Sequence, residues 1–214
     1  MPAKRNPIKD ITHRDLMLPG SSSKPFDRPG WLYELNYDGV RVLAVHQGKE
    51  VRLLSRSGRD LAPSFPEIAE DLAALPDVVL DAELMILDKR GKPELGRLRR
   101  RASLTRESAV RNASLWEPAA LLVFDILVFR RTDVRGLPLL KRKEIAKTVL
   151  FKSVGAFGRT RLVQHVGEGA SALFEAASAL KLEGIIAKRA DAPYSAGRSR
   201  DWLKIRTPHG RHSK

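Results

Sequence analysis

The residues best suited to chemistry lie in the stretch YELNYDGVR, residues 33–41. Glu34 stands two places before the central Asn36, and Asp38 and Gly39 begin two places after it. This arrangement suits a reactive side chain, but the central residue carries an amide. The lone pair of an amide nitrogen is delocalised into the carbonyl, so Asn36 can form hydrogen bonds but cannot act as a nucleophile.

Charged and aromatic side chains recur in five later clusters along the chain. These are Ser55-Arg56-Ser57-Gly58, Asp81-Ala82-Glu83-Leu84, Phe124-Asp125, Glu183-Gly184-Ile185-Ile186-Ala187-Lys188 and Asp201-Trp202-Leu203-Lys204-Ile205-Arg206. Neither a Walker pattern nor GxGxxG is present. If a nucleotide binds, side chains rather than a glycine-rich loop must therefore hold its phosphates.

In their order and spacing, the six clusters resemble the adenylation domain of ATP-dependent DNA ligases, within the covalent nucleotidyltransferase superfamily. The resemblance covers residues 15–206. Tyr194, Gly197 and Arg198, with segments 58–60 and 65–67, are especially similar to ligases of bacterial end-joining repair. An ordered set of motifs is far more specific than any single one. It implies an ATP-grasp-like α+β fold of antiparallel sheets flanked by helices.

The family pattern at the first motif is Glu-x-Lys-x-Asp-Gly-x-Arg, and Asn36 occupies the place of the nucleophilic lysine. In the family this lysine attacks the α-phosphate of ATP, expels pyrophosphate and holds AMP in a phosphoramidate bond. We therefore expect no self-adenylation by the usual route. The later sealing step, in which a 3′-hydroxyl attacks DNA already carrying AMP, needs no lysine nucleophile. Weak sealing of pre-adenylated nicks is the residual activity we expect.

The resemblance implies roles for the other motif residues. The expected nucleotide-binding residues are Glu34 at the adenine edge, Phe124 on the base, Arg41, Arg56 and Glu83 at the ribose and phosphates, and Lys188, Lys204 and Arg206 at the α-phosphate. Glu83 and Glu183 are the expected ligands of a divalent metal ion. The expected cofactors are therefore ATP and either Mg²⁺ or Mn²⁺. Arg206 stands where the family often has lysine, and its planar fork differs from a point charge.

The charge balance favours a polyanionic partner. The chain has 39 Lys and Arg against 25 Asp and Glu, a net charge of +14, which favours nucleic acid through counterion release. We expect DNA contacts from the most basic segment, at Arg97, Arg99, Arg100 and Arg101. A generally basic, solvated surface is the alternative. The expected partners are DNA with nicks or double-strand ends, and an OB-fold domain or repair proteins acting in trans.

Composition excludes several classes of protein. The chain has 214 residues, enough for one substantial domain, and no cysteine, which excludes disulfides and thiolate metal sites. Its five histidines show no metal-ligand spacing. The longest apolar run, residues 119–129, is too short to span a membrane and contains Asp125. We expect a soluble cytoplasmic protein, associated with the nucleoid of a bacterium and with no membrane partner.

The expected secondary structure places the motifs on strands. Segments 31–36, 40–46 and 51–55 indicate an antiparallel meander, and Ser64 with Glu67 fits a capping box that opens a helix to about residue 75. A long strand at 78–87 and a buried central strand at 120–129 follow. The remaining elements expected are a helix at 139–150, a strand at 161–166, a helix at 170–180 and strands at 184–188 and 202–206.

The expected domain boundaries are an irregular lead-in at 1–30, the adenylation domain at 31–206 and a frayed tail at 207–214. The chain leaves no room for the OB-fold domain that usually follows, so we expect none.

Several alternatives stay open. Asn36 fits a degenerate nucleotide- or DNA-binding module, a deliberate substitution in an otherwise active enzyme, or a nucleophile relocated to Lys188 or Lys204. A domain like the mRNA capping guanylyltransferases shares the first motif, and it would prefer GTP to ATP. Taken singly, Asp38-Gly39 fits an ordinary hairpin turn, and Phe124 fits core packing.

Overall fold

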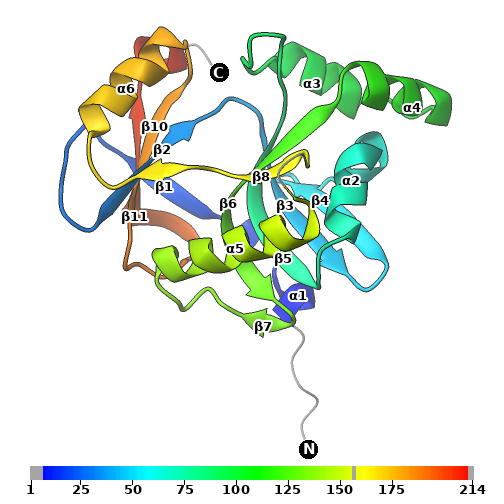
Figure 1. Cartoon of the computed structure of the whole chain (residues 1–214), viewed down its shortest axis with the longest axis horizontal. Coiled ribbons are helices and arrows are strands. Elements are labelled where there is room, and N and C mark those ends of the chain that lie inside the picture. The colour runs from blue at the N-terminus through cyan, green and yellow to red at the C-terminus, as the bar shows by residue number, and fades with distance from the viewer. Residues whose placement is uncertain (1–6, 156–157, 212–214) are drawn as a thin grey trace, which may run out of the picture.

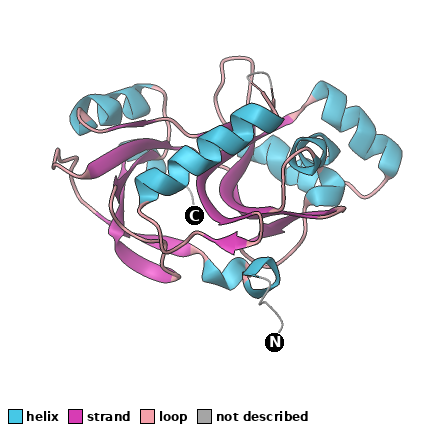
Figure 2. Cartoon of the chain, turned by 60° about the horizontal axis from the view of Figure 1, so that its bottom comes forward, coloured by secondary structure: helices cyan, strands magenta, loops and turns pink. Residues whose placement is uncertain are grey.

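Two β-sheets form the centre of the molecule and helices pack around them (Figure 1, Figure 2). The computed structural model describes residues 7–155 and 158–211. Its strands come in clusters along the chain rather than in regular alternation with helices. The predicted α+β class is therefore confirmed, although two of the strand pairs, described below, are parallel.

Sheet A has the strand order β1-β11-β10-β2-β9. Its strands are β1 (Met17–Ser21), β2 (Trp31–Asn36), β9 (His165–Val166), β10 (Gly184–Arg189) and β11 (Gly197–Arg206). β1 runs parallel to β11, whereas the other neighbours are antiparallel. Sheet A therefore joins strands from both ends of the described chain.

Sheet B has the order β4-β3-β5-β6-β7, and β8 pairs with β6 in parallel. Its strands are β3 (Val40–Gln47), β4 (Glu50–Ser55), β5 (Val78–Ile86), β6 (Ala119–Phe129), β7 (Thr132–Asp133) and β8 (Thr160–Leu162). Leu121, Val123 and Ile126 of β6 are fully buried. The apolar run in the sequence thus forms a central strand, as predicted.

Six α-helices lie in the described residues: α1 (Pro7–Asp10), α2 (Pro66–Ala73), α3 (Leu95–Ala102), α4 (Glu107–Trp116), α5 (Leu139–Ser153) and α6 (Ala170–Ala179). Short 3-10 turns occupy His13–Asp15, Ala62–Ser64 and Pro208–Arg211. α6 packs on β2 and β10 of sheet A, whereas α2 and α5 pack on sheet B. None of the helices described here is long and apolar enough to cross a membrane.

The largest hydrophobic core lies between sheet B and helices α2 and α5. Ile68 and Leu72 of α2 are fully buried in it, as are Leu80 of β5 and Leu121 of β6. Removing such a side chain from water contributes about 1.5–3 kcal/mol. This burial makes sheet B a firm support for the side chains that alternate onto its opposite face.

Helix α5 carries two buried cations on consecutive residues, Arg142 and Lys143. Arg142 forms a bidentate ion pair with Asp125 of β6, with Nε and Nη2 2.7 and 2.8 Å from the two carboxylate oxygens. Lys143 points to sheet A, where its Nζ lies 2.6 Å from Oε1 of Glu34 on β2. One turn of α5 is therefore tied to both sheets.

The predicted meander over residues 31–55 is wrong at its first connection. β2 lies in sheet A and β3 in sheet B, and only β3 and β4 form a hairpin. Residues 37–39 therefore cross between the sheets and are not a hairpin turn. Gly39 is required at this crossing, because a Cβ there would lie 2.5 Å from the carbonyl oxygen of Leu84.

The structure also corrects both predicted ends of the domain. The lead-in is not irregular throughout, because β1 belongs to sheet A and Met17 is fully buried. The tail does not fray from Thr207, whose buried hydroxyl donates a 2.7 Å hydrogen bond to the carbonyl of Leu182. Residues 1–6 and 212–214, which the lead-in and tail included, lie outside the described part of the chain.

Two local predictions are also wrong. No side chain caps α2, which follows Phe65, so Ser64 and Glu67 form no capping box there. The expected strand at 161–166 is divided: β8 pairs with sheet B and β9 with sheet A. The chain therefore crosses between the sheets at residues 163–164, as it does at residues 37–39.

Candidate functional site

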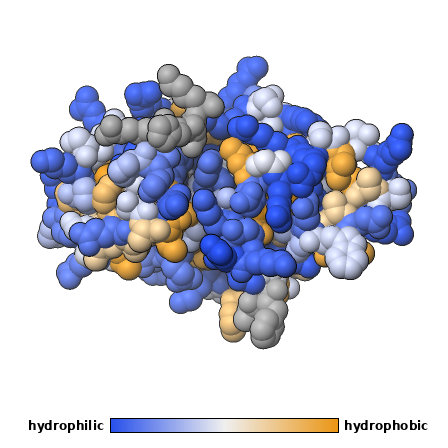
Figure 3. Space-filling view, turned by 90° about the horizontal axis from the view of Figure 1, so that it is seen from above, coloured by the Kyte–Doolittle hydropathy of each residue, from blue (hydrophilic) through white to orange (hydrophobic). Residues whose placement is uncertain are grey.

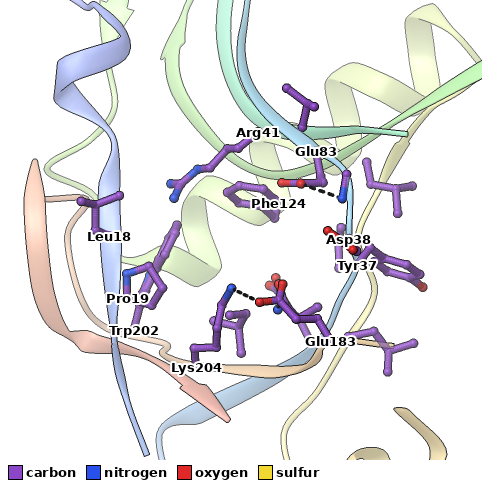
Figure 4. Close-up of a pocket in the computed structure, with 18 of the residues that line it drawn as sticks. Leu18, Pro19, Tyr37, Asp38, Arg41, Glu83, Phe124, Glu183, Trp202 and Lys204 are labelled. Carbon is purple, nitrogen blue, oxygen red and sulfur yellow. Dashed lines mark hydrogen bonds and ion pairs between the residues drawn. The ribbon is translucent and has the colours of Figure 1, made fainter. Parts of the chain in front are cut away.

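A cavity of about 560 Å³ opens between the two sheets. Sheet A contributes Trp202, Lys204 and the end of β2, whereas sheet B contributes Arg41, Glu83 and Phe124. Figure 4 shows these two groups approaching the cavity from opposite sides, with Glu183 beside Lys204. The cavity is the place where the clusters predicted from the sequence meet.

Asn36, at the end of β2, lies in the cavity wall and is hydrogen-bonded to Glu183. Its Nδ2 donates to Oε2 of Glu183 at 2.8 Å. Oε1 of the same carboxylate accepts from Nζ of Lys204 at 2.9 Å. The amide of Asn36 and the ammonium group of Lys204 thus share the carboxylate of Glu183 in the cavity wall.

Glu83 faces this group from sheet B. Oε1 of Glu83 accepts a 3.1 Å hydrogen bond from the backbone N–H of Gly39. Burial raises the pKa of Glu83 to about 8, and the nearby carboxylates of Asp81 and Glu183 add to the shift, although Arg41 and Lys204 oppose it. Glu83 therefore carries a proton at neutral pH in the protein alone, and a cation between the carboxylates would favour its ionised form.

Arg41 is fixed by a buried network behind the cavity. Its Nε and Nη2 donate to the two oxygens of Asp81 at 2.9 and 2.6 Å, and Nη2 also donates to the carbonyl of Met17 at 2.7 Å. The hydroxyl of Tyr194 donates to Asp81 at 2.6 Å and accepts from the N–H of Met17 at 2.9 Å. The network thus sets the position of Arg41 and joins β1 to sheet B.

Two aromatic side chains and a buried ammonium form another wall. Phe124 and Trp202 meet edge to face, with ring centroids 5.9 Å apart. Nζ of Lys188 lies 4.5 Å from the Phe124 centroid and 4.2 Å from the Trp202 centroid. Such contacts hold a cation against the rings, so this wall combines apolar surface with positive charge.

Glu34 lies between two lysines. Nζ of Lys188 donates to Oε2 at 2.7 Å, and Nζ of Lys143 lies 2.6 Å from Oε1. Burial alone would raise the pKa of Glu34, but the charges of Lys143 and Lys188 outweigh it and hold the pKa below its usual value. Glu34 is 2% exposed, and its contact with an adenine edge stays a prediction.

The structure brings most of the predicted site residues together. The cavity is lined by Glu34, Asn36, Arg41, Arg56, Glu83, Phe124, Glu183, Lys188 and Lys204. Arg206 does not line it: its side chain is half-exposed, and its Nε lies 3.9 Å from Oε1 of Glu183. The nucleotide and metal contacts of these residues remain predictions.

Lys143 and Tyr194 touch the site from behind, and sequence reasoning gave neither a role in it. Tyr194 was one of the residues on which the family resemblance rested, but its neighbours in the sequence gave no sign that its hydroxyl contacts Asp81. Lys143 stands in a basic stretch of α5 that fits a solvated helix face. The available signal for the burial of Lys143 was its spacing from the apolar Leu139, four residues earlier. Residues four apart share one face of a helix, and Leu139 is fully buried.

The arginine cluster on α3 divides into buried and exposed members. Arg101 is 1% exposed, and its guanidinium binds both carboxylate oxygens of Glu67 at 2.6 and 3.0 Å. The prediction that Arg101 contacts DNA is therefore wrong. Arg97 and Arg100 are exposed but lie 3.8 and 3.2 Å from the carboxylate of Glu117.

Arg99 is exposed on the same helix. The face of the molecule that carries α3, α4 and α6 is largely hydrophilic, with apolar side chains in small separate groups (Figure 3). DNA binding by Arg97, Arg99 and Arg100 remains a prediction that this surface allows.

Within residues 7–155 and 158–211, no three His, Asp or Glu side chains cluster closely enough to hold a metal ion by themselves. Glu83 and Glu183 therefore supply two carboxylate ligands at most. Mg²⁺ is commonly bound by one or two carboxylates together with phosphate oxygens of a substrate and water. The pair fits a metal ion that arrives with a nucleotide.

Comparison with protein families gives one clear result. A family model for the ATP-dependent DNA ligase domain matches residues 21–206. Proteins named probable DNA ligase from Beutenbergia cavernae and Anaeromyxobacter sp. are 33% and 35% identical over 179 residues. Each match covers 82% of this chain and 34% of the relative. The chain therefore spans about a third of the length of these relatives.

Solved structures agree. The ligase domain of LigD from M. tuberculosis superposes with a TM-score of 0.71 at 27% identity, covering 90% of this chain and 60% of that one. A mycobacterial DNA ligase D complexed with ATP gives 0.65 at 29% identity, covering 89% and 60%. The ATP-dependent ligase of bacteriophage T7, at 18% identity and a TM-score of 0.66, shares the fold. The predicted nucleotidyltransferase-type fold is thereby confirmed.

Proposed function

The chain belongs to the ATP-dependent DNA ligase family, and from this premise we propose that its cavity binds ATP while Asn36 blocks transfer of AMP to the protein at the usual position. The observation that carries the proposal is the amide of Asn36, hydrogen-bonded to Glu183 inside a cavity otherwise furnished with cations and aromatic rings. Such a domain binds its nucleotide without forming the covalent intermediate.

The cavity offers complementary surfaces to the two halves of ATP. Phe124 supplies a ring on which a purine can stack, an interaction of about 1–3 kcal/mol per base. Lys188, Lys204 and Arg41 bring positive charge to the same space. We assign Lys204 to the α-phosphate because its ammonium lies beside Asn36, through their shared partner Glu183.

Glu83 and Glu183 would hold Mg²⁺ or Mn²⁺ together with the phosphates. In the protein alone Glu83 is protonated at neutral pH, and the charge of Glu183 contributes to its raised pKa. A bound divalent ion would neutralise part of the negative charge on the phosphates of the bound ATP. The carboxylates fit this role because they are paired with lysine and with a backbone N–H, which fixes their positions.

Asn36 lacks both the reactivity and the reach of lysine. Its nitrogen donates a hydrogen bond to Glu183, and its lone pair is delocalised, so it cannot attack phosphorus. DNA that already carries AMP on its 5′-phosphate bypasses this step. We propose that the domain acts on nicked or broken DNA in the bacterial cytoplasm, at the nucleoid, and retains weak metal-dependent sealing of pre-adenylated nicks. Charge developing there would be stabilised by Arg41, Lys188 and Lys204.

The DNA partner follows from the family and from the charge of +14. The match covers only 34% of the length of these relatives, so we propose that full ligation depends on further protein segments. An OB-fold domain or repair proteins acting in trans are the partners we propose for that purpose. The exposed arginines of α3, Arg97, Arg99 and Arg100, would contact the DNA backbone.

The proposal is tested by intact-mass measurement after incubation with ATP and Mg²⁺ or Mn²⁺, together with calorimetric titration of ATP. We expect ATP binding with no added mass. An AMP adduct on the unaltered chain would contradict the role given to Asn36 and would direct attention to Lys188 or Lys204. Absence of ATP binding would contradict the proposed function itself. Stronger binding of GTP than ATP would favour a guanylyltransferase-like domain.

A further inference from the structure

We propose that Lys143, which lies behind the cavity, is a positioning residue that keeps Lys188 available to the phosphates of a nucleotide. Lys143 is 2% exposed and does not line the cavity, whereas Lys188 does. The two ammonium groups meet through Glu34, with one on each carboxylate oxygen. This inference rests on the proposed ATP binding.

The charges of the cluster explain the effect. Glu34, Lys143 and Lys188 are all buried, and in their ionised forms they carry two positive charges and one negative charge. Burial lowers the pKa of Lys188, the charge of Glu34 opposes this shift, and the charge of Lys143 adds to it. A further buried carboxylate, that of Asp125, is already bound by Nε and Nη2 of Arg142. One positive charge of the cluster is therefore left over, and of the two lysines Lys188 is the one that lines the cavity.

His165 does not alter this balance. It lies opposite Glu34 in the pairing of β9 with β2. Burial lowers the pKa of His165, and the charge of Lys143 adds to the shift. The imidazole is therefore neutral at neutral pH and leaves the surplus charge with the lysines. Without Lys143, Glu34 and Lys188 would become a neutral pair.

Geometry gives Lys143 a second effect on the same groups. Its neighbour Arg142 is fixed to Asp125 of β6, one residue from Phe124. Lys143 itself is fixed to Glu34 of β2. α5 thus sets the separation between the strand that carries the aromatic wall and the strand that carries Glu34. The ion pair of Lys143 holds the carboxylate of Glu34 between the two lysines, so that it bridges both ammonium groups and does not neutralise Lys188 alone.

The charge effect is separated from packing by comparing ATP with adenosine, which has no phosphates. We expect Lys143→Met to weaken ATP binding about tenfold and adenosine binding less than about twofold, because a neutral cluster attracts only the phosphates less. Lys143→Arg, which keeps the charge, should bind ATP nearly as the unaltered chain does. Lys147→Met, which removes an exposed lysine one turn along α5, should change neither affinity.

A double variant gives the sharpest test, because it also removes the charge of Glu34, whose Oε1 loses its partner in Lys143→Met. Glu34→Gln combined with Lys143→Met returns the cluster to one surplus positive charge, so ATP affinity relative to adenosine affinity should recover compared with Lys143→Met. Taking this ratio removes a change at the adenine edge, where Glu34 is expected. Calorimetric titration of both ligands measures each Kd. A parallel loss of ATP and adenosine binding, or no recovery in the double variant, would overturn the inference. If the unaltered chain binds adenosine but not ATP, the proposed function fails instead.

Discussion

Asn36 and Glu183 face one another across the end of sheet A, with Nδ2 of the amide 2.8 Å from Oε2 of the carboxylate. The other oxygen of Glu183 binds Lys204. The position that we propose corresponds to the family's nucleophilic lysine is therefore occupied by a short polar side chain with a fixed partner. A lysine placed there would start within reach of the same carboxylate, because Asn36 of β2 pairs with Gly184, the first residue of β10, and Glu183 directly precedes it.

Asn36→Lys should restore self-adenylation. The longer amine would reach the α-phosphate, and its localised lone pair could attack once it is deprotonated. We expect the intact mass of the variant to rise by one AMP after incubation with ATP and a divalent ion. Asn36→Gln is the matched control, since it adds length without an amine, and it should gain no mass. A variant that binds ATP but gains no adduct would show that the lysine alone is insufficient.

Phe124→Leu should weaken the binding of ATP and adenosine equally, by about tenfold or more, because the stacking surface for the base is lost. This equal loss distinguishes Phe124 from Lys143, whose replacement acts through the phosphates. Phe129→Leu, on the same strand but away from the cavity lining, is the control and should leave both affinities unchanged. Undiminished nucleotide binding by Phe124→Leu would contradict the stacking role.

The stability of the protein alone should fall as pH rises toward about 8, because of Glu83. Burial raises the pKa of Glu83 from the usual 4.5 to about 8. Between these values the unfolded chain has released the proton that the folded chain keeps, so folding becomes less favourable as pH increases. Glu83→Gln keeps the acceptor for Gly39 and removes the titration. The Glu83→Gln variant should show a flatter dependence of the free energy of unfolding on pH, and it should become more stable than the unaltered chain as pH rises.

Urea unfolding at several pH values between about 5 and 8 measures this slope. Glu70→Gln, which replaces a carboxylate of α2 outside the cavity, is the control and should leave the slope in place. Parallel curves for the unaltered chain and Glu83→Gln would contradict the raised pKa.

Arg101→Met should destabilise the fold by about 3–5 kcal/mol, the usual cost of leaving a buried carboxylate without its partner. The carboxylate concerned is that of Glu67, which also accepts the N–H of Ala119 at the start of β6. Arg99→Met, on the exposed side of the same helix, should change the free energy of unfolding by less than about 0.5 kcal/mol. Chemical denaturation of the two variants compares them directly.

Arg99→Ala should weaken DNA binding and make its dependence on salt less steep by about one unit in the log–log plot, if one phosphate contact is lost. Arg111→Ala is the control: it removes an exposed arginine of α4 that is paired with Glu107 in the structure. If the affinities of the Arg99→Ala protein and the unaltered chain depend equally on salt concentration, Arg99 does not contact the DNA backbone and the prediction is wrong.

The motif residues were predictable because their order along the chain is specific even though each one is ordinary. Glu34, Asn36, Glu83, Phe124, Lys188 and Lys204 do line one cavity. The strands that carry them were also predictable, since alternation and apolar runs give clear signals. The long strand β6 and the helix α5 were both expected from these patterns.

The pairing of the strands was not predictable in the same way. Residues 37–39 are as short as a hairpin turn, and only tertiary contacts, such as the approach of Gly39 to Leu84, send β2 and β3 to different sheets. Arg101 was misjudged because four arginines in five residues suggest a solvated helix face. Arg101 shares the buried face of α3 with Leu98, three residues earlier, and its partner Glu67 is remote in sequence.

The parallel pairing of β1 with β11 imposes an order of events on a chain emerging from a ribosome. β1 is made early, but its partner in sheet A lies near the other end of the described residues. At about 5–20 residues per second, the intervening chain takes roughly ten seconds or longer to be synthesised. Only then do Trp202 and Lys204 arrive with β11. Nucleotide retention by a nascent chain would therefore report that translation has passed this strand.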